Sequence, residues 1–330
     1  MGRRNLTAGL LLACVLALVG CARPDLPRDP EAPALAPPPL QMVGLGALAM
    51  GTVLRLWCAE GAPETISPTE ALNTQGTVTW LGHAGFVIQL AGQSVIVDPI
   101  LKEGALTTAG LGGRIATAPD LSQLAKLDAV IISHNDNDHL DRPTLRALAE
   151  RFPEAVLILP EGSRLSRPVR GFAEVIELRA WQSHKLGALE VTATPAIHFG
   201  RRAPFSWRMS PALGMAFSGD GRRVFFSGDT TYGPVFAEIG EKLGPFDLAL
   251  VSIGTSRPAT LVNDQHMTPE QAVRLARDLG AKRAVPHHYG TFRTTPDSPA
   301  EVLTRFKAAA ESGLDVVALP VGGSTCIAPR

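Results

Sequence analysis

Short apolar runs alternate with polar turns and amphipathic segments along most of this chain, from residue 76 to its end. Most of the apolar runs are closely followed by Gly, Asp, Asn or Pro, which is typical of strands that end in turns. The predicted strands are residues 78–81, 86–90, 94–97, 129–133, 155–159, 189–194, 214–218, 224–227, 248–253 and 284–286. The alternation predicts one domain that mixes strands with helices.

One helix is marked at both ends, over residues 269–279. Thr268 is its predicted N-cap, Gln271 completes a capping box, and Gly280 ends the helix. Another helix is predicted to begin near Arg142. Because hairpin pairs and helical crossovers both occur, the sequence predicts an α/β fold with two mixed sheets covered by helices.

The N-terminus has the three parts of a secretory signal. Arg3 and Arg4 precede an apolar run over residues 10–19, and small residues follow before Cys21. That run is too short to span a bilayer comfortably, since a membrane helix needs about 20 apolar residues. The sequence therefore predicts export, and an uncleaved anchor helix stays open as an alternative.

Residues 18–21, Leu-Val-Gly-Cys, resemble the lipobox of bacterial lipoproteins. The resemblance implies a signal peptide over residues 1–20 and a lipid on Cys21, which would anchor the mature protein in a membrane. Ala22 stands where an inner-membrane retention signal has Asp, so the resemblance favours the outer membrane, facing the periplasm. A soluble secreted protein is the alternative.

Two segments connect this signal to the folded domain. Residues 21–41 are rich in proline and lack apolar periodicity, which predicts an extended tether. Residues 42–75 form an apolar extension, in which residues 42–57 could be a packing helix or a membrane-surface element. The domain itself is predicted over residues 76–330.

Composition excludes two classes of protein. With 45% hydrophobic residues in a chain of 330, a substantial core can form, which excludes disorder of the whole chain. Lys+Arg and Asp+Glu both total 31, so no net charge draws the chain to nucleic acid, and no such partner is expected. Outside the signal and lipobox, Cys58 and Cys326 remain; a disulfide between them and two isolated thiols are both open.

Potential metal ligands crowd into one loop directly after the predicted strand 129–133. His134, Asp136, Asp138 and His139 lie within six consecutive residues. Catalytic metal sites need imidazole and carboxylate groups that converge on one ion. A loop at a strand end permits that convergence, so the sequence predicts a metal site here.

This loop resembles the His-x-His-x-Asp-His signature of the metallo-β-lactamase superfamily. Further pieces of the resemblance follow in order along the chain: Trp80-Leu81-Gly82-His83-Ala84, Val97-Asp98-Pro99-Ile100, Thr194-Pro195-Ala196-Ile197-His198, Ser227-Gly228-Asp229-Thr230 and Val285-Pro286-His287-His288-Tyr289-Gly290-Thr291-Phe292. Together they resemble most closely the branch that contains N-acylphosphatidylethanolamine-hydrolysing phospholipase D and the ascorbate-phosphate lactonases. The resemblance runs from about Gly76 to the C-terminus and implies a four-layer αβ/βα sandwich of two mixed sheets covered by helices.

The resemblance also implies the ligands of one or two divalent metal ions. One ion would be held by His134, Asp136 and His198, the other by Asp138, His139 and His288, with Asp229 bridging the two. At position 136 the second His of the signature is a carboxylate, which suits manganese or iron better than imidazole does. Zinc is the first expectation, and manganese or iron is the alternative.

Asp138 and His266 are the predicted catalytic residues. A pair of cations lowers the pKa of a bound water, so that a metal-bound hydroxide can attack phosphorus or a carbonyl carbon near neutral pH. The resemblance to the phospholipase-like branch places His266 on the substrate side, where it could donate a hydrogen bond to a substrate oxygen. An exposed loop histidine is the alternative. Asp98 is predicted to orient a ligand histidine.

The remaining histidines leave alternatives open. His83 either lines the pocket or is satisfied by backbone at a strand end. His287 could replace His288 as a ligand, although His288 fits the His-aromatic-Gly-Thr-Phe pattern of the resemblance. His184 lies outside every motif and is expected to be structural or exposed.

The resemblance implies a metal-dependent hydrolase, and more narrowly a phospholipase D-like phosphodiesterase that acts on a phospholipid or another amphiphile. Its partners would be a small-molecule or lipid substrate, and the membrane through Cys21. A lactonase or another ester or amide hydrolase is the second interpretation, because the same chemistry attacks carbonyl carbon. A degenerate metal-binding envelope lipoprotein is the third, supported by the changed residue Asp136.

Overall fold

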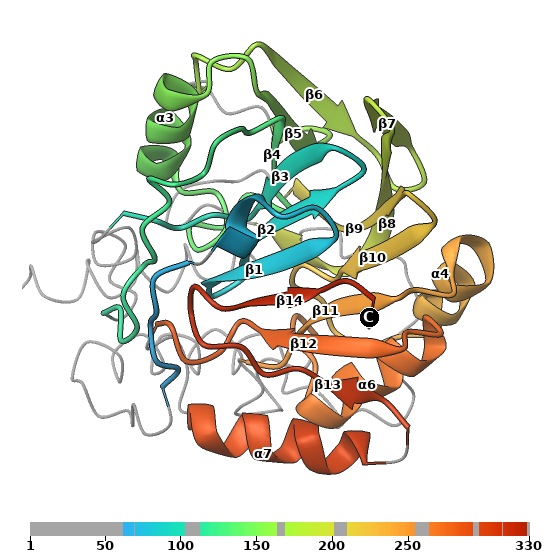
Figure 1. Ribbon diagram of the computed structural model, residues 1–330. Coiled ribbons are helices and arrows are strands. Elements are labelled where there is room, and N and C mark those ends of the chain that lie inside the picture. Colours follow the sequence, from blue (N-terminus) through green and yellow to red (C-terminus); the bar gives the residue numbers. More distant parts are fainter. Residues whose placement is uncertain are drawn as a thin grey trace, which may run out of the picture.

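Two mixed β-sheets pack face to face, with helices on their outer faces (Figure 1). The computed structural model describes residues 62–68, 70–102, 113–163, 169–200, 210–254, 264–292, 297–311 and 313–328. Within these residues each sheet has seven strands. Four layers result, and the predicted α/β fold class is confirmed.

The first sheet combines a hairpin region with a parallel region. Its strands, in spatial order, are β14 (Ser324–Cys326), β1 (Thr77–Gly82), β2 (Gly85–Leu90), β3 (Gln93–Val97), β4 (Ala129–Ile131), β5 (Val156–Pro160) and β6 (Glu174–Leu178). Tight turns join β1, β2 and β3, so these strands pair antiparallel, whereas β3 to β6 pair parallel. The segments β3, β4 and β5 are nearly all apolar because both of their faces are covered.

The second sheet repeats this arrangement in reverse chain order. Its strands, in spatial order, are β13 (Asp315–Val316), β12 (Arg283–His287), β11 (Leu248–Ser252), β10 (Arg222–Phe226), β9 (Ser210–Gly219), β8 (Leu189–Gly200) and β7 (Ser183–Leu186). The pairs from β10 to β13 are parallel and those from β7 to β10 are antiparallel. The register between β8 and β9 shifts between Pro195 and Phe199, which forms the bulge that carries His198.

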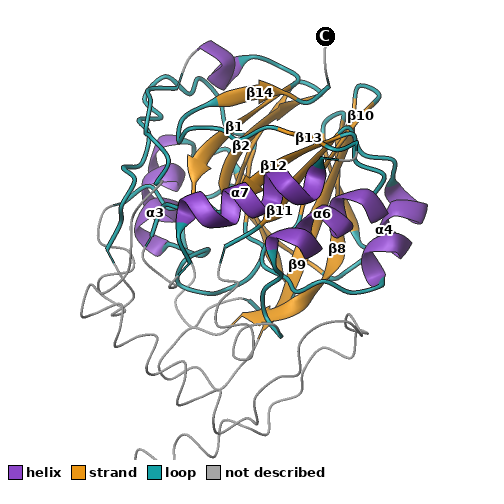
Figure 2. Ribbon diagram, turned by 90° about the horizontal axis from the view of Figure 1, so that it is seen from below, coloured by secondary structure: helices purple, strands orange, loops and turns teal. Residues whose placement is uncertain are grey.

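Helices cover the outer face of each sheet (Figure 1, Figure 2). The helix α3 (Arg142–Arg151) packs on the first sheet, and α4 (Val235–Leu243), α6 (Pro269–Asp278) and α7 (Pro299–Ala310) pack on the second. A 3-10 helix, η2 (Glu70–Asn73), precedes β1. The carboxylate of Asp141 caps α3 by accepting a hydrogen bond of 3.0 Å from the backbone N–H of Thr144. This cap fixes the end of the loop that carries four of the predicted ligands.

Two cores hold the layers together. The larger core lies between the sheets and under α6 and α7, and the smaller lies between the first sheet and α3. Along β2, Phe86 and Ile88 belong to the larger core, while Val87 between them belongs to the smaller one. This division follows from the two-residue period of a strand, which points successive side chains to opposite faces. The sheet that supplies part of the site is thus fixed from both sides.

Each predicted strand coincides with an observed one, β1 to β5 and β8 to β12. The predicted strand 189–194 is too short, because β8 continues through its bulge to Gly200. The strands that the sequence does not predict, β6, β7, β13 and β14, are the four edges of the two sheets. Edge strands carry polar residues such as Glu174 and Lys185, so they lack a continuous apolar run. The predicted helix 269–279 corresponds to α6, and its capping box is present.

Residues 62–68 pack on the body of the domain. The backbone groups of Glu64 and Ile66 pair with Val321 through two hydrogen bonds of 2.8 Å. Pro63 lies so close to Gly290 that a Cβ added there would come within 2.2 Å of it. The predicted domain boundary at residue 76 therefore falls between η2 and β1, inside a segment that is already docked.

Several predictions for the N-terminal part concern residues that the structure does not describe. The signal peptide 1–20, Cys21, the tether, the segment 42–57 and Cys58 all lie outside the described residues. Cys326, within them, has a free thiol on β14. Across the described part of the chain, no helix combines the length and the apolarity needed to cross a membrane.

Candidate metal centre

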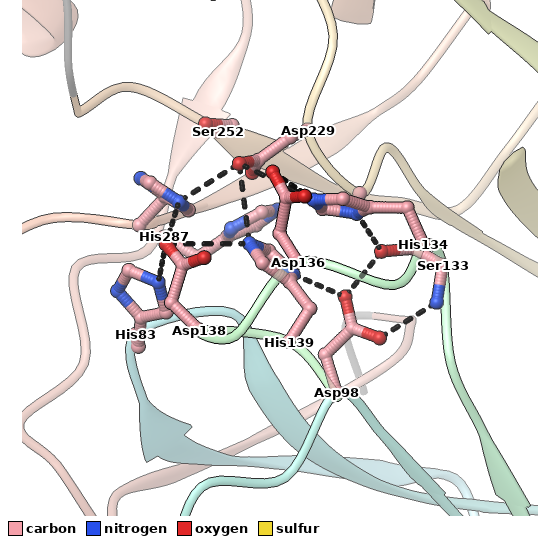
Figure 3. Close-up of polar contacts among 12 residues, drawn as sticks. His83, Asp98, Ser133, His134, Asp136, Asp138, His139, Asp229, Ser252 and His287 are labelled. Atoms are coloured by element: carbon pink, nitrogen blue, oxygen red, sulfur yellow. Dashed lines mark hydrogen bonds and ion pairs between the residues drawn. The ribbon is translucent and has the colours of Figure 1, made fainter. Parts of the chain in front are cut away.

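The predicted ligands gather at one edge of the two sheets, where several strands end (Figure 3). They come from the loop after β4 (His134, Asp136, Asp138 and His139), the bulge of β8 (His198), and the residues that follow β10 (Asp229) and β12 (His288). In α/β folds, sites form where parallel strands end, because the side chains that follow neighbouring strands meet at one edge. Both sheets thus contribute side chains to one cluster.

Asp229 lies at the centre of this cluster. Its Oδ2 atom is 3.0 Å from Nε2 of His288 and 3.1 Å from Nε2 of His139. Nε2 of His134 is 4.0 Å from the same oxygen. The side chain of Asp229 is 3% exposed, and its Oδ1 has no hydrogen-bond partner among the described residues. A buried carboxylate approached by imidazoles from both sheets is suited to bridge two cations.

One group of side chains lies on the His134 side of Asp229. Oδ2 of Asp136 is 3.5 Å from Nε2 of His134 and 3.5 Å from Nε2 of His198. Ligand atoms of these three residues lie within 4.8 Å of one another. Both Nε2 atoms are buried and find no hydrogen-bond partner in the part of the chain that the structure describes. Buried polar atoms are rarely left unpaired, so these nitrogens fit a cation.

A second group lies on the His288 side of Asp229. Oδ2 of Asp138 is 3.7 Å from Nε2 of His288 and 3.9 Å from Nε2 of His139. Ligand atoms of these three residues and of His83 lie within 4.8 Å of one another. The structure therefore brings together the same two trios that the sequence predicts, with Asp229 between them.

Asp98 orients two of the imidazoles, one directly and one through Ser133 (Figure 3). Its Oδ2 accepts a hydrogen bond of 2.7 Å from Nδ1 of His139 and one of 2.5 Å from Oγ of Ser133. Oγ of Ser133, having given its own proton to Asp98, accepts a hydrogen bond of 2.8 Å from Nδ1 of His134. Both rings therefore carry their proton on Nδ1 and present Nε2 to the cluster, as ligation requires.

The segment before α6 closes the cluster from another side. The carbonyl oxygen of Gln265 accepts a hydrogen bond of 3.0 Å from Nδ1 of His198, which leaves Nε2 of that ring for the cluster. Nδ1 of the next residue, His266, is 3.8 Å from Oδ2 of Asp229 and has no hydrogen-bond partner within the described residues. Only 13% of the His266 side chain is exposed, so this histidine faces the site rather than solvent.

Burial and charge act in opposite directions on these imidazoles. Burial alone would lower the pKa of His288, but the negative charge of Asp229 and the hydrogen bonds to Asp138 and Asp229 together outweigh it and raise this pKa to about 9. The same carboxylate, together with Asp98, raises the pKa of His139 against its burial. Burial lowers the pKa of His266 to about 3. The metal-free site therefore holds protons on His288 and His139, which a cation must displace, whereas burial lowers the pKa of His83, beside Asp138, to about 4.

Two other histidines lie outside the cluster. His287 points into the core between the sheets, where its ring packs edge-on against Phe86 and its Nε2 lies 3.3 Å from Oγ of Ser227. Of the two neighbouring histidines, His288 is thus the one that faces Asp229. His184 is on β7, away from the site, as expected.

Three residues of the site have a left-handed backbone: His83, Asp98 and His288, with φ of 51°, 39° and 63°. This region is costly for a residue with a Cβ and persists where the surrounding structure fixes it. Such positions concentrate at functional sites because they aim side chains that a regular strand or turn would direct elsewhere. Nothing in the sequence identifies them.

The sequence does not predict three supports of the site. These are the Ser133 hydroxyl, the Gln265 carbonyl, and the close approach of Asn135 to Gly200. A Cβ added to Gly200 would lie 2.7 Å from the backbone nitrogen of Asn135. Ser133 directly precedes the first predicted ligand, and this was the one available signal. The other two contacts depend on packing between segments far apart in the sequence.

The match to a known family agrees with this geometry. The profile described as "Beta-lactamase superfamily domain" matches residues 93–289, a span that contains all seven predicted ligands. The chain belongs to the β-lactamase superfamily. It is a metal-dependent hydrolase of the metallo-β-lactamase fold, and its His/Asp cluster is able to bind metal.

Individual proteins give finer comparisons. An uncharacterized protein of Mycobacterium tuberculosis (strain ATCC 25618 / H37Rv) is 36% identical over 253 residues, which are 74% of this chain and 67% of that protein. N-acyl-phosphatidylethanolamine-hydrolyzing phospholipase D 1 of Caenorhabditis elegans is 31% identical over 226 residues, 65% of this chain and 64% of that enzyme. The chain thus spans less than two thirds of the nematode protein. Igni18, a metallo hydrolase from the archaeon Ignicoccus hospitalis, shares the fold with a TM-score of 0.58 at 22% identity, over 76% of this chain and 97% of that chain.

Proposed function

We propose that this protein is a phospholipase D-like phosphodiesterase that acts on a phospholipid or a related amphiphile. The observation that carries the proposal is the pair of His/Asp groups on either side of Asp229, with His266 turned toward the same carboxylate. Two adjacent cation positions are the arrangement that phosphodiester hydrolysis uses to stabilise attacking and leaving oxygens. Similarity to the C. elegans phospholipase D supports the choice of substrate class.

The residues present fit two divalent ions. His134, Asp136 and His198 would hold one ion, and Asp138, His139 and His288 the other, with Asp229 between them. When bound, such ions supply Lewis-acid polarisation of the phosphorus centre and lower the pKa of water. Each group mixes imidazole with carboxylate, so manganese or iron fits it as well as zinc.

His266 is the proposed contact to the substrate. Its low pKa keeps the ring neutral at physiological pH, so that one ring nitrogen carries a hydrogen that can be donated to a phosphoryl oxygen. Asp138 is the proposed carboxylate on the reactive side, where 18% of its side chain is exposed against 3% for Asp229. There it can accept a hydrogen bond from the attacking water and orient it.

Anchoring is a separate part of the proposal. A lipid on Cys21 would hold the enzyme at the outer membrane, facing the periplasm, next to its substrate. This part rests on the sequence of residues 1–22, which the structure does not describe.

The test is a hydrolysis assay with the full-length chain, loaded with zinc or manganese. The substrates are bis-p-nitrophenyl phosphate, N-acylphosphatidylethanolamine in mixed micelles, and a lactone. We expect both phosphodiesters to be cleaved, with phosphatidic acid released from the lipid, and we expect chelation to abolish turnover. Asp229→Asn should be inactive, while His184→Gln, a histidine substitution on β7, should match the wild type.

Other outcomes would replace the proposal. Cleavage of the lactone alone would favour the lactonase or ester and amide hydrolase interpretation. A protein that binds no metal and cleaves none of the substrates would favour the degenerate envelope lipoprotein.

A further inference from the structure

His83 lies in the turn between β1 and β2, where the fold holds it in a left-handed conformation with only 2% of the residue exposed. Its backbone N–H donates a hydrogen bond of 2.6 Å to Oγ1 of Thr291. Its carbonyl oxygen accepts hydrogen bonds from Nε1 of Trp80, at 3.0 Å, and from the backbone N–H of His288, at 2.9 Å. Two of these hydrogen bonds tie the turn to the segment after β12 and the third ties it to β1, which explains how the unfavourable backbone persists.

The side chain of His83 reaches the cluster from that anchored backbone. Its ring centroid is 4.0 Å from that of His288, and the edge of the ring contacts Phe292, at a centroid distance of 5.2 Å. Nε2 of His83 is 3.2 Å from Oδ2 of Asp138, the contact drawn between these residues in Figure 3. An ionised carboxylate can only accept hydrogen bonds, so Nε2 carries the proton.

We infer that His83 is a positioning residue for Asp138: the hydrogen bond from Nε2 to Oδ2 fixes the carboxylate beside Nε2 of His288 and Nε2 of His139. A ring nitrogen that carries this proton has no lone pair for a cation, so His83 supports the second group without being one of its ligands. This role rests on the proposed function, because it concerns the cation that the Asp138 group would hold. Asp98 acts on His139 in the opposite sense, since there a carboxylate orients an imidazole.

Three substitutions separate the hydrogen bond from the packing of the ring. His83→Phe keeps an aromatic ring beside His288 but has no donor. His83→Asn adopts the left-handed backbone readily, yet its side chain is too short to reach Asp138. His83→Gln keeps a terminal N–H donor at nearly the length of histidine. His184→Gln is the matched control, because it makes the same change outside the site.

The experiment titrates the full-length, metal-stripped proteins with Co²⁺ and follows the visible absorption of each bound ion, with melting temperature and turnover measured in parallel. We expect His83→Phe and His83→Asn to weaken one of the two binding steps by roughly 10–100-fold, the usual cost of losing a group that orients a ligand. The other step should stay unchanged. His83→Gln and the control should remain close to the wild type.

Each contrary result has its own meaning. Wild-type Co²⁺ binding in His83→Phe and His83→Asn would overturn the role of His83 while leaving the proposed function intact. Equal weakening of both steps, with a lower melting temperature, would show a purely structural residue and overturn the inference. Loss of one whole step in all three variants, including His83→Gln, would overturn it in favour of direct ligation by the ring. A wild type that bound no Co²⁺ would remove the proposed function, and this role with it.

Discussion

Nδ1 of His139 lies 2.7 Å from Oδ2 of Asp98, and neither side chain is exposed. Asp98 directly follows β3, and His139 lies in the loop after the neighbouring parallel strand β4, so the bond joins two strand ends. The same oxygen of Asp98 also holds His134 through Ser133. One buried carboxylate therefore orients an imidazole in each of the two ligand groups.

Asp98→Asn is expected to weaken the binding of both cations. Asn tolerates the positive φ at this position, so the main effect is the loss of the charged acceptor for His139 and Ser133. Groups that orient a ligand contribute roughly 10–100-fold to metal affinity or activity. Competition with a chelating dye measures both affinities. Ser133→Ala removes only the link between Asp98 and His134, so it should weaken the binding of one cation. Equal loss of affinity at both sites would contradict the separate roles of the two hydrogen bonds.

Removal of the cations is expected to lower the melting temperature. A ligand that binds only the folded state stabilises it, by about 2.7 kcal/mol at a free concentration 100 times its dissociation constant. Scanning calorimetry after chelation, and again after zinc or manganese is restored, measures the difference. In Asp229→Asn the gain on metal addition should shrink, because both ions lose a shared ligand. A full gain in that variant would show that Asp229 does not lie between two ions.

The stability of the metal-free protein should be greatest near pH 6.5. Against the effect of burial, the carboxylates of Asp229 and Asp138 raise the pKa of His288 from 6.5 to about 9. The stabilising contribution of protonated His288 is therefore complete below pH 6.5 and is lost as the pH rises toward 9. Burial lowers the pKa of His266 from 6.5 to about 3, so the folded protein keeps this ring neutral while the unfolded chain takes up a proton. The fold therefore loses stability as the pH falls below 6.5. Melting temperatures measured in the presence of a chelator from below pH 6.5 up to pH 9 test both decreases in stability.

Bound metal should reverse the loss of stability that is expected between pH 6.5 and 9. Ligation requires neutral imidazoles, so cation binding releases protons and strengthens as the pH rises toward 9. Calorimetric titration in two buffers of different ionisation enthalpy measures the protons released. A metal-free protein that grew steadily more stable from pH 6.5 to 9, or a titration without proton release, would contradict these assignments.

The local part of the site was predictable from the sequence, and so was the role of Asp98, whereas the other supports of the site were not. His134, Asp136, Asp138 and His139 fall in one loop, so a short signature identifies them. The bond from His83 to Asp138 joins positions 55 residues apart and depends on a left-handed turn that no residue pattern marks. Such contacts arise only when strands far apart in the sequence are assembled into one sheet.

The same division holds for the fold. Central strands such as β4 and β11 are apolar along their length because both faces are buried, so periodicity finds them. Edge strands such as β6 are half-exposed and polar, and they form because a neighbouring strand offers its hydrogen bonds. The extension of β8 to His198 likewise depends on pairing with β9 through a bulge.

Thr268→Ala is expected to destabilise the protein by about 1 kcal/mol, the usual effect of losing an N-cap side chain. Oγ1 of Thr268 accepts a hydrogen bond of 3.3 Å from the backbone N–H of Gln271, and Oε1 of Gln271 accepts one of 2.9 Å from the backbone N–H of Thr268. Urea denaturation at fixed metal concentration measures the change. Thr268→Ser keeps the hydroxyl and is the control. Equal losses in the two variants would show that the cap is not the cause.

Asp136→His is expected to shift the metal preference of the first group toward zinc. In this protein each group has two imidazoles and one carboxylate of its own and shares Asp229, so the two donor sets match. The substitution gives the first group three imidazoles, which suit zinc, in place of an oxygen donor that suits manganese or iron. Loading with equal zinc and manganese, followed by elemental analysis, should show zinc replacing manganese in the variant. An unchanged ratio would mean that Asp136 is not a ligand, and that His134, His198 and Asp229 alone hold the first ion.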